Sequence, residues 1–312
     1  MSEALSIAGG AADIAPDRRV PWRRALTVGL PVVAFGVLAA VLLARRDTFL
    51  GALDAAPVWL LACAVALQLL ALLARSEAWR LCVGAAGSTI SRRGVFRASG
   101  IGGLAGILNG QVGVAARIAA LRRSAPSQCP RVPALVAAEV PIVAVEATLA
   151  ALTSFTLLGP LGLPWWAAAL CVAAATGAVM GLSVLSRRRT TGLWSGLAIL
   201  RSLDGRSRIV ALVLIAVFAQ IARNWLALNA IGVDASVFDA IAVLIALVAL
   251  STLPLGPSVG AAAVVLILGA DGVALAAAAG VLLSATGMAG TLCFGGWALA
   301  DRLRPVRAGA PA

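Results

Sequence analysis

Long apolar runs alternate with short polar segments along almost the whole chain, and the runs lack the every-second-residue alternation of half-buried strands. An apolar run of about 20 residues has the length of a membrane-spanning helix. A transmembrane β-barrel would show segments of about ten residues with alternating polarity. The pattern therefore predicts an all-α polytopic membrane protein. We expect about six spans, at residues 25–43, 57–74, 133–158, 165–185, 209–231 and 273–299.

One further run, residues 98–121, overlaps the stretch ILNGQVGVAARIAALRR. In this stretch the polar residues Asn109 and Gln111 interrupt the apolar sequence, and glycines lie beside them. Arginines lie on both sides, and short basic loops favour the cytoplasmic face. A segment that begins and ends at one face must turn back, so we expect a re-entrant hairpin with its tip at 109–113. A bulky residue at Gly110 would block the turn if its φ is positive. The alternative is an ordinary glycine-rich span.

The second broken run contains STLPLGPSVGAAA, whose prolines and glycines cannot all lie inside one regular helix. Its halves, 240–253 and 258–270, are each short for a span, so we expect a second re-entrant hairpin that opens from the opposite face. Two opposed hairpins form an inverted repeat, in which the broken segments mark a transport site. Ser258 would offer its hydroxyl and nearby amides to an anion, unless this stretch is a plain loop.

Arginine-rich segments at both ends of the chain place both termini in the cytoplasm. Residues 1–24 and 301–312 are then cytoplasmic tails, and 25–300 form a single integral membrane domain. Trp165 and Asp234 would face outside. The first run is longer than the apolar core of a signal peptide, so it should remain as a span.

Composition agrees with this class, because 61% of the residues are hydrophobic and 12% are charged, whereas soluble domains hold about 25% charged residues. The net charge of +12 comes from arginines clustered between spans, which the positive-inside rule explains better than nucleic-acid binding does. The chain has no His, so Ser–His and metal-hydrolase sites are hard to build. We expect no enzymatic activity and no cofactor. The absence of Lys, His and Tyr indicates a GC-rich bacterial genome, and hence a bacterial inner membrane.

Ionisable residues inside the apolar runs are the candidate chemistry, since such groups are usually functional or paired. Glu139 and Glu146 are seven residues apart and share one helical face. They could be counter-ions for Arg117 or Arg223, or a proton relay. Arg117 could bind a lipid phosphate or could be a basic anchor at the membrane surface.

A third polar set lies on the run at 209–231, where Gln220, Arg223 and Asn224 share one helical face. An arginine at mid-membrane costs about 2.5–3.5 kcal/mol on insertion scales, which the apolar residues of this run can offset. This face should therefore point into protein or a cavity. The alternative is that Arg223 extends to the outer interface.

The two broken stretches resemble the two signatures of the lysylphosphatidylglycerol synthase transmembrane-region family of flippase-like proteins. ILNGQVGVAARIAALRR is similar to the first, "LN…LPGRLGE…R", with Arg117 at the family's arginine and Asn109 near its asparagine. LPLGPSVGAAAVVLILGADGVALAAA is similar to the second, "P-G-G-L-G…E". Glu139 corresponds to the acidic residue of the helix after the first hairpin. The resemblance covers residues 25–300 and departs from the family at Gln111, Val114, Val140 and Ala263.

The resemblance implies movement of a lipid between leaflets, and the family's soluble transferase domain is not expected here. Our first hypothesis is a flippase-like transporter of an anionic or polyprenyl-linked lipid. The alternative is a non-transporting membrane scaffold that binds lipid or partner proteins, and a lipid-modifying enzyme is a weaker third. Membrane lipids are the expected partners. The sequence leaves the oligomeric state open.

Overall fold

The computed structural model describes residues 57–107, 110–188, 192–251, 259–269 and 273–303, and within these ranges it contains helices and no strands. The expected span at 25–43 and the candidate residues Asn109 and Ser258 lie outside these ranges. The helices are α3 (Val58–Ala85), α4 (Arg92–Gly106), α5 (Gly110–Ser124), α6 (Val132–Ala137), α7 (Val140–Leu152), α8 (Trp165–Arg188), α9 (Leu203–Asn229), α10 (Val237–Leu250), α11 (Val259–Leu268) and α12 (Val273–Leu303), with short 3-10 helices at Pro126–Gln128, Ser154–Leu157 and Gly192–Arg201.

Five helices of the described part are long and apolar enough to cross a membrane, judged by length and composition. They are α3, α6 together with α7, α8, α9 and α12. The helices α10 and α11 are apolar but shorter, as expected for the halves of the second broken run. The all-helical membrane class predicted from the apolar runs is therefore confirmed at this level.

The boundaries differ from the sequence expectation in two places. We expected a basic loop from Arg75, but α3 continues to Ala85, and ion pairs to Glu146 and Glu77 neutralise Arg75 and Arg80. The span expected at 133–158 is instead split between α6 and α7. Pro141 near the start of α7 cannot donate a hydrogen bond to the preceding turn, so the helix restarts there.

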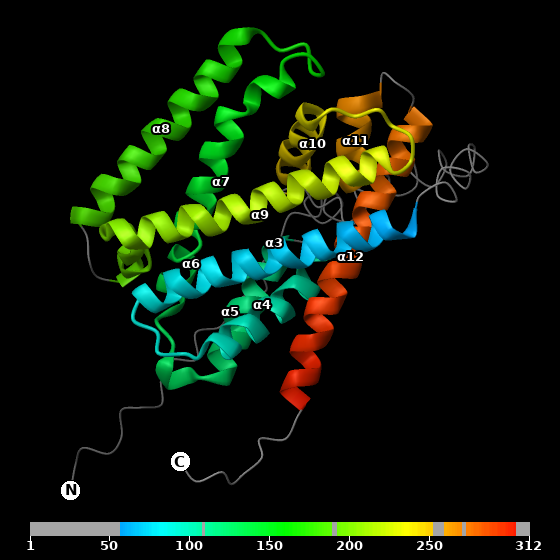
Figure 1. Cartoon of the computed structure of the whole chain (residues 1–312). Coiled ribbons are helices and arrows are strands. Elements are labelled where there is room, and N and C mark those ends of the chain that lie inside the picture. Colours follow the sequence, from blue (N-terminus) through cyan, green and yellow to red (C-terminus); the bar gives the residue numbers. More distant parts are fainter. Residues whose placement is uncertain (1–56, 108–109, 189–191, 252–258, 270–272, 304–312) are drawn as a thin grey trace, which may run out of the picture.

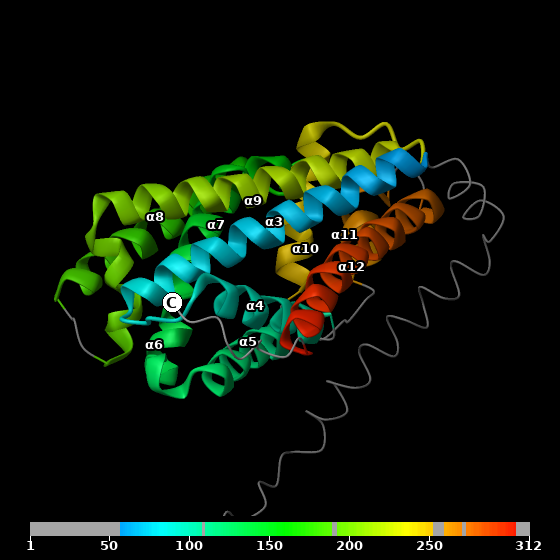
Figure 2. The same ribbon diagram turned by 60° about the horizontal axis from the view of Figure 1, so that its bottom comes forward.

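The centre of the molecule is an antiparallel pair of long helices, α3 and α9, which lie side by side in Figures 1 and 2. Buried alanines on each helix, Ala71 and Ala74 facing Ala216 and Ala219, form the middle of their contact. The hydrophobic effect does little to bring membrane helices together, because the lipid tails around them are also apolar. Small residues let two such helices approach closely, so van der Waals contacts can hold them together. This pair provides the frame on which the other helices pack.

Helix α12 joins the two broken segments, because it packs on α11 near its start and on α4 near its end. Glycines make both contacts close. A Cβ on Gly280 would lie 2.6 Å from the carbonyl oxygen of Gly260 in α11, and a Cβ on Gly100 would lie 2.6 Å from Cβ of Ala298. One helix of each short pair, α11 or α4, is thus held against the same long helix.

The helices α4 and α5 form the first hairpin, and glycines bring their backbones together. A Cβ on Gly113 would lie 2.8 Å from Cα of Gly106 and 2.9 Å from the carbonyl oxygen of Gly102. The prediction for Gly110 depended on a positive φ, and the close backbone contact is made by Gly113 instead. Gly110 begins α5, faces open space, and is not among the described glycines with positive φ.

Helix α8 lies at the periphery and has no buried residue in its most apolar 18-residue window. It packs mainly on α7 and on the 3-10 helix Gly192–Arg201, and it diverges from α9 away from their shared end (Figure 1). Trp165 and Trp166 are exposed at the other end of α8, where an aromatic belt would meet a membrane interface.

Candidate functional site

Arg117 of α5 lies in a closed cluster between α3, α5 and the junction of α6 with α7. Its guanidinium forms an ion pair with Glu139 and stacks over the Trp79 ring, with its carbon 4.2 Å from the ring centre. The side chains of Arg117 and Glu139 are 11% and 12% exposed, and Trp79 is fully buried. Gly102 makes room, because a Cβ there would lie 2.6 Å from Cβ of Arg117.

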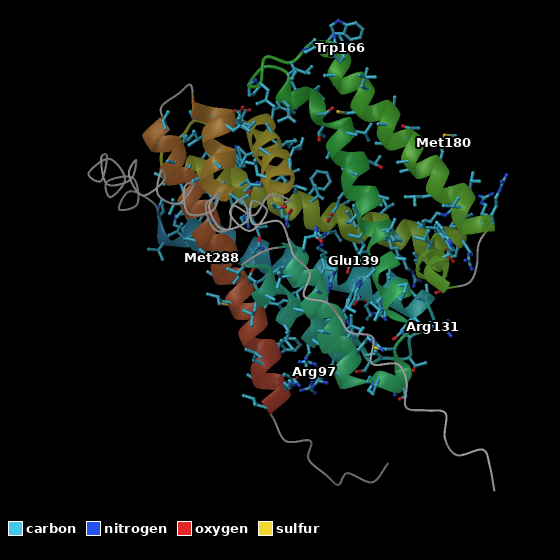
Figure 3. The ribbon with its side chains drawn as sticks, turned by 180° about the vertical axis from the view of Figure 1, so that it is seen from behind. Arg97, Arg131, Glu139, Trp166, Met180 and Met288 are labelled. Atoms are coloured by element: carbon cyan, nitrogen blue, oxygen red, sulfur yellow. The ribbon has the colours of Figure 1, made fainter. Side chains whose placement is uncertain are left out.

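This geometry decides between the roles considered for Glu139: it is the counter-ion of Arg117. The pair neutralises both charges, and the aromatic face adds cation–π stabilisation to the guanidinium. Arg117 is thus neither a surface anchor nor an uncompensated cation. Figure 3 shows Glu139 in the interior, between the ends marked by Trp166 and Arg97.

The second acidic residue has a different partner. Glu146 of α7 forms a 2.7 Å ion pair with Arg75 of α3, and these side chains are 23% and 39% exposed. Although Glu139 and Glu146 are seven residues apart, each meets its own arginine. The described contacts therefore give two separate ion pairs rather than a chain of carboxylates.

Arg223 of α9 lies in a third polar cluster, and this one contains no carboxylate in the described part of the protein. Its guanidinium donates to the side-chain oxygens of Gln68 in α3 and of Asn224 beside it, the latter at 3.0 Å. Arg223 and Gln68 are each 8% exposed, and Asn224 is fully buried. The Nε of Arg223 and the Nδ2 of Asn224 are buried donors without a hydrogen-bond partner.

The surroundings of Arg223 explain how a guanidinium fits between long helices. Two glycines of α12 face the cluster: a Cβ on Gly287 would lie 3.1 Å from Nη1 of Arg223, and one on Gly290 would lie 2.6 Å from Cγ of Gln68. Arg223 is six residues from the last residue of α9, or about 9 Å along the axis. It is held inside the α3–α9–α12 contact.

The rest of the predicted set is dispersed. Gln220 is partly buried one turn before Arg223, and no hydrogen bond of its side chain is recorded within the described ranges. Gln111 is exposed in the first turn of α5, close to the connection from α4 where the hairpin tip was expected. Of the nine candidate residues, the structure brings together Arg117 with Glu139 and Arg223 with Asn224.

Sequence analysis missed several residues that build these clusters. Gln68 could have been found, because it is the only amide in the apolar run at 57–74. Trp79 gave no signal, since an aromatic residue in an apolar helix is ordinary core. Its buried indole nitrogen has no hydrogen-bond partner.

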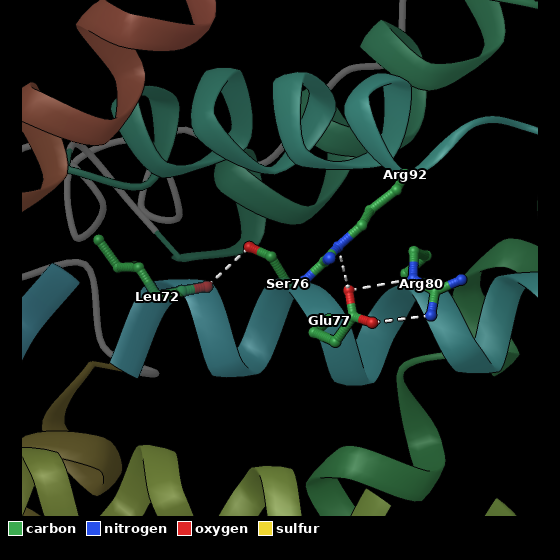
Figure 4. A network of polar contacts seen from close by, with 5 residues as sticks. All are labelled: Leu72, Ser76, Glu77, Arg80 and Arg92. Atoms are coloured by element: carbon green, nitrogen blue, oxygen red, sulfur yellow. Dashed lines mark hydrogen bonds and ion pairs between the residues drawn. The ribbon is translucent and has the colours of Figure 1, made fainter. Parts of the chain in front are cut away.

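A network of ion pairs also joins α3, α4 and α12 at the end marked by Arg97 in Figure 3. Glu77 accepts from Arg80 at 2.7 and 3.0 Å and from Arg92 at 3.1 Å (Figure 4). Arg93 donates to both carboxylate oxygens of Asp301 at the end of α12, with its Nε 3.0 and 2.9 Å away. These pairs fix the start of the first hairpin to its neighbours.

Comparisons with known proteins give no match: no family model, no curated protein and no solved structure resembles the chain significantly. Within the described ranges, no three His, Cys, Asp or Glu side chains gather as metal ligands would. The chemistry of the interior is therefore that of arginines, carboxylates and amides.

Proposed function

We propose that this protein binds an anionic lipid and moves it between the two leaflets of a bacterial inner membrane. The observation that supports this most is the buried guanidinium of Arg223, whose recorded partners are the neutral amides Gln68 and Asn224. Amide dipoles orient the cation but do not cancel its charge. Ionisable residues inside a membrane are costly and typically line a substrate or ion path.

A phosphate is the anion that suits this site. Phosphate oxygens form short charge-assisted bonds with a guanidinium, and such bonds are about twice as strong as bonds between neutral groups. The buried Nε of Arg223 and Nδ2 of Asn224 are unused donors at the same place. Within this proposal, the headgroup of the lipid takes up these donors while its chains stay in the membrane.

The proposed topology has six spans, two re-entrant hairpins and both termini in the cytoplasm. The close glycine contact between α4 and α5 supports the first hairpin, and the two short apolar helices α10 and α11 support the second. One helix of each proposed hairpin, α4 or α11, packs on α12, which also contributes Gly287 beside Arg223. Movement of either hairpin would thus shift α12 beside the proposed headgroup site.

A second candidate function is a non-transporting scaffold that holds lipid or partner proteins. The observation that favours it is that the Arg117 guanidinium is already paired inside the protein, with the Glu139 carboxylate and the Trp79 ring. Arg117 therefore has little capacity left to bind a substrate. A scaffold would bind anionic lipid at Arg223 without carrying it across.

Reconstituted vesicles distinguish these functions. The purified full chain is incorporated into vesicles that contain phosphatidylglycerol with a fluorophore on one acyl chain. A membrane-impermeant reductant then destroys the fluorophores in the outer leaflet. Without transport, about half of the signal is protected. We expect the protein to expose most of that protected pool, and to act faster on phosphatidylglycerol than on labelled phosphatidylcholine. Vesicles that keep the protected half, despite retained lipid, would favour the scaffold.

A further inference from the structure

A pocket of about 350 Å³ lies between α7, α8 and α9, away from the Arg223 and Arg117 clusters. This volume is within the range of about 300–1,000 Å³ typical of small-molecule sites. The pocket is partly enclosed and partly open to its surroundings. Its lining residues come mainly from these three helices, of which α8 diverges from α9 in Figure 1.

The walls of the pocket are almost entirely apolar. They include Pro141, Val145 and Leu149 of α7, Val179 and Leu182 of α8, and Ile209 of α9. The Thr148 hydroxyl in this wall donates to the Ala144 carbonyl at 2.7 Å, so its donor is already used. Such a surface is complementary to a hydrocarbon chain, and the surplus of exposed apolar residues on α8 places lipid tails at its entrance.

One charged residue, Arg206, lines the pocket at its basic end. Its Nε donates to the backbone carbonyl of Leu200, which fixes the guanidinium, while its terminal nitrogens have no recorded hydrogen bond within the described ranges. Arg187, Arg188 and Arg208 are exposed nearby, at the end of α8 and the start of α9. None of these four arginines forms an ion pair with a carboxylate in the described part of the chain.

We propose that this pocket holds one acyl chain of an anionic glycerophospholipid, whose phosphate is bound by Arg206. The lipid would be a resident of the leaflet nearest the basic loop, and it would fill the angle between α8 and the rest of the bundle. This inference is independent of transport, because it concerns a different set of residues and a lipid that stays bound.

The geometry matches such a lipid in length as well as in charge. The α8 residues of the wall, Val179 to Ser183, precede Arg187 by four to eight positions, or about 6–12 Å along the helix axis. A chain in the pocket therefore has its headgroup level with the arginines. Clustered arginines at a membrane surface attract anionic lipids by about 1 kcal/mol each. An uncharged headgroup would satisfy the walls but leave these cations unpaired.

Native mass spectrometry of the full chain tests the proposal with phosphatidylglycerol or phosphatidylcholine added to the detergent. We expect the wild type to retain one phosphatidylglycerol in preference to phosphatidylcholine. Arg206→Gln should weaken that retention by about fivefold to tenfold. The matched control is Arg122→Gln, an exposed arginine on α5 that does not line the pocket. Equal retention by wild type and Arg206→Gln, or no preference for phosphatidylglycerol, would overturn the proposal.

A second variant tests the wall separately from the charge. Ser183 lines the pocket from the peripheral helix α8, so Ser183→Leu should fill space without disturbing the core. We expect it to lower retention of the phosphatidylglycerol. A photo-crosslinker at Val179 should then label lipid in the wild type. Crosslinking instead to residues 25–43 of the same chain would mean that a protein segment occupies the pocket, and the proposal would be wrong.

Discussion

Replacing Glu139 with Gln is expected to lower the free energy of unfolding by about 3–5 kcal/mol. The change preserves side-chain volume but removes the counter-ion of Arg117, which lies between Trp79 and the α6–α7 junction at 11% exposure. A buried cation without its partner keeps its desolvation cost and loses the attraction that offset it. Thermal unfolding in detergent, followed by size-exclusion chromatography of heated samples, measures the loss.

Two companion variants make this result specific. Glu146→Gln breaks the pair with Arg75, whose side chains are 23% and 39% exposed, so it should cost less than Glu139→Gln because the long Arg75 side chain is freer to reach another polar partner. The double variant Arg117→Met with Glu139→Leu removes both charges and should recover much of the stability. If Glu139→Gln and Glu146→Gln unfold at the same temperature, the Arg117 cluster is not the buried pair described above.

Gly113→Leu is expected to destabilise the protein by about 1–3 kcal/mol or more through separation of α4 from α5. The new Cβ would lie 2.8 Å from Cα of Gly106 and 2.9 Å from the carbonyl oxygen of Gly102. These are backbone atoms, which cannot rotate away as a side chain can, so one helix must move. Amide hydrogen exchange should rise in both helices of the hairpin.

Gly110→Leu is the matched control, because a Cβ added there meets nothing within 4 Å. It should leave amide exchange and thermal unfolding close to those of the wild type. A stronger effect at Gly110 than at Gly113 would contradict the observed packing and would favour the tight turn expected from sequence.

The comparison of sequence with structure shows what an apolar pattern can and cannot specify. Apolar runs located the long helices, since run length alone decides whether a helix can cross a membrane. They did not locate the end of α3. That helix continues past Arg75 and Arg80 because Glu146 and Glu77 neutralise them, and Glu146 lies on a different helix.

The candidate site was predictable only in part for the same reason. Charges in the apolar runs identified Arg117, Glu139 and Arg223 from the sequence, and Arg117 was a candidate partner of Glu139. The partners that were missed, Gln68 and Trp79, lie on another helix. Gln68 is 155 positions from Arg223, and Trp79 is 38 positions from Arg117. The sequence did not single out Gly113, because it shows that a glycine is present, whereas the closeness of that glycine to another backbone depends on how α4 and α5 face each other.

The measurement that tests the proposed function most directly is lipid translocation by a series of Arg223 variants in the same vesicles. Arg223→Gln keeps a polar side chain beside Gln68 and Asn224 but removes the charge, and Arg223→Lys keeps the charge without the planar fork that binds phosphate. Arg122→Gln controls for the loss of one arginine elsewhere, and thermal unfolding of each variant confirms that it folds. We predict that phosphatidylglycerol translocation falls to the protein-free level in Arg223→Gln, is reduced in Arg223→Lys, and is unchanged in Arg122→Gln. Wild-type rates in folded Arg223→Gln would contradict a headgroup site at Arg223.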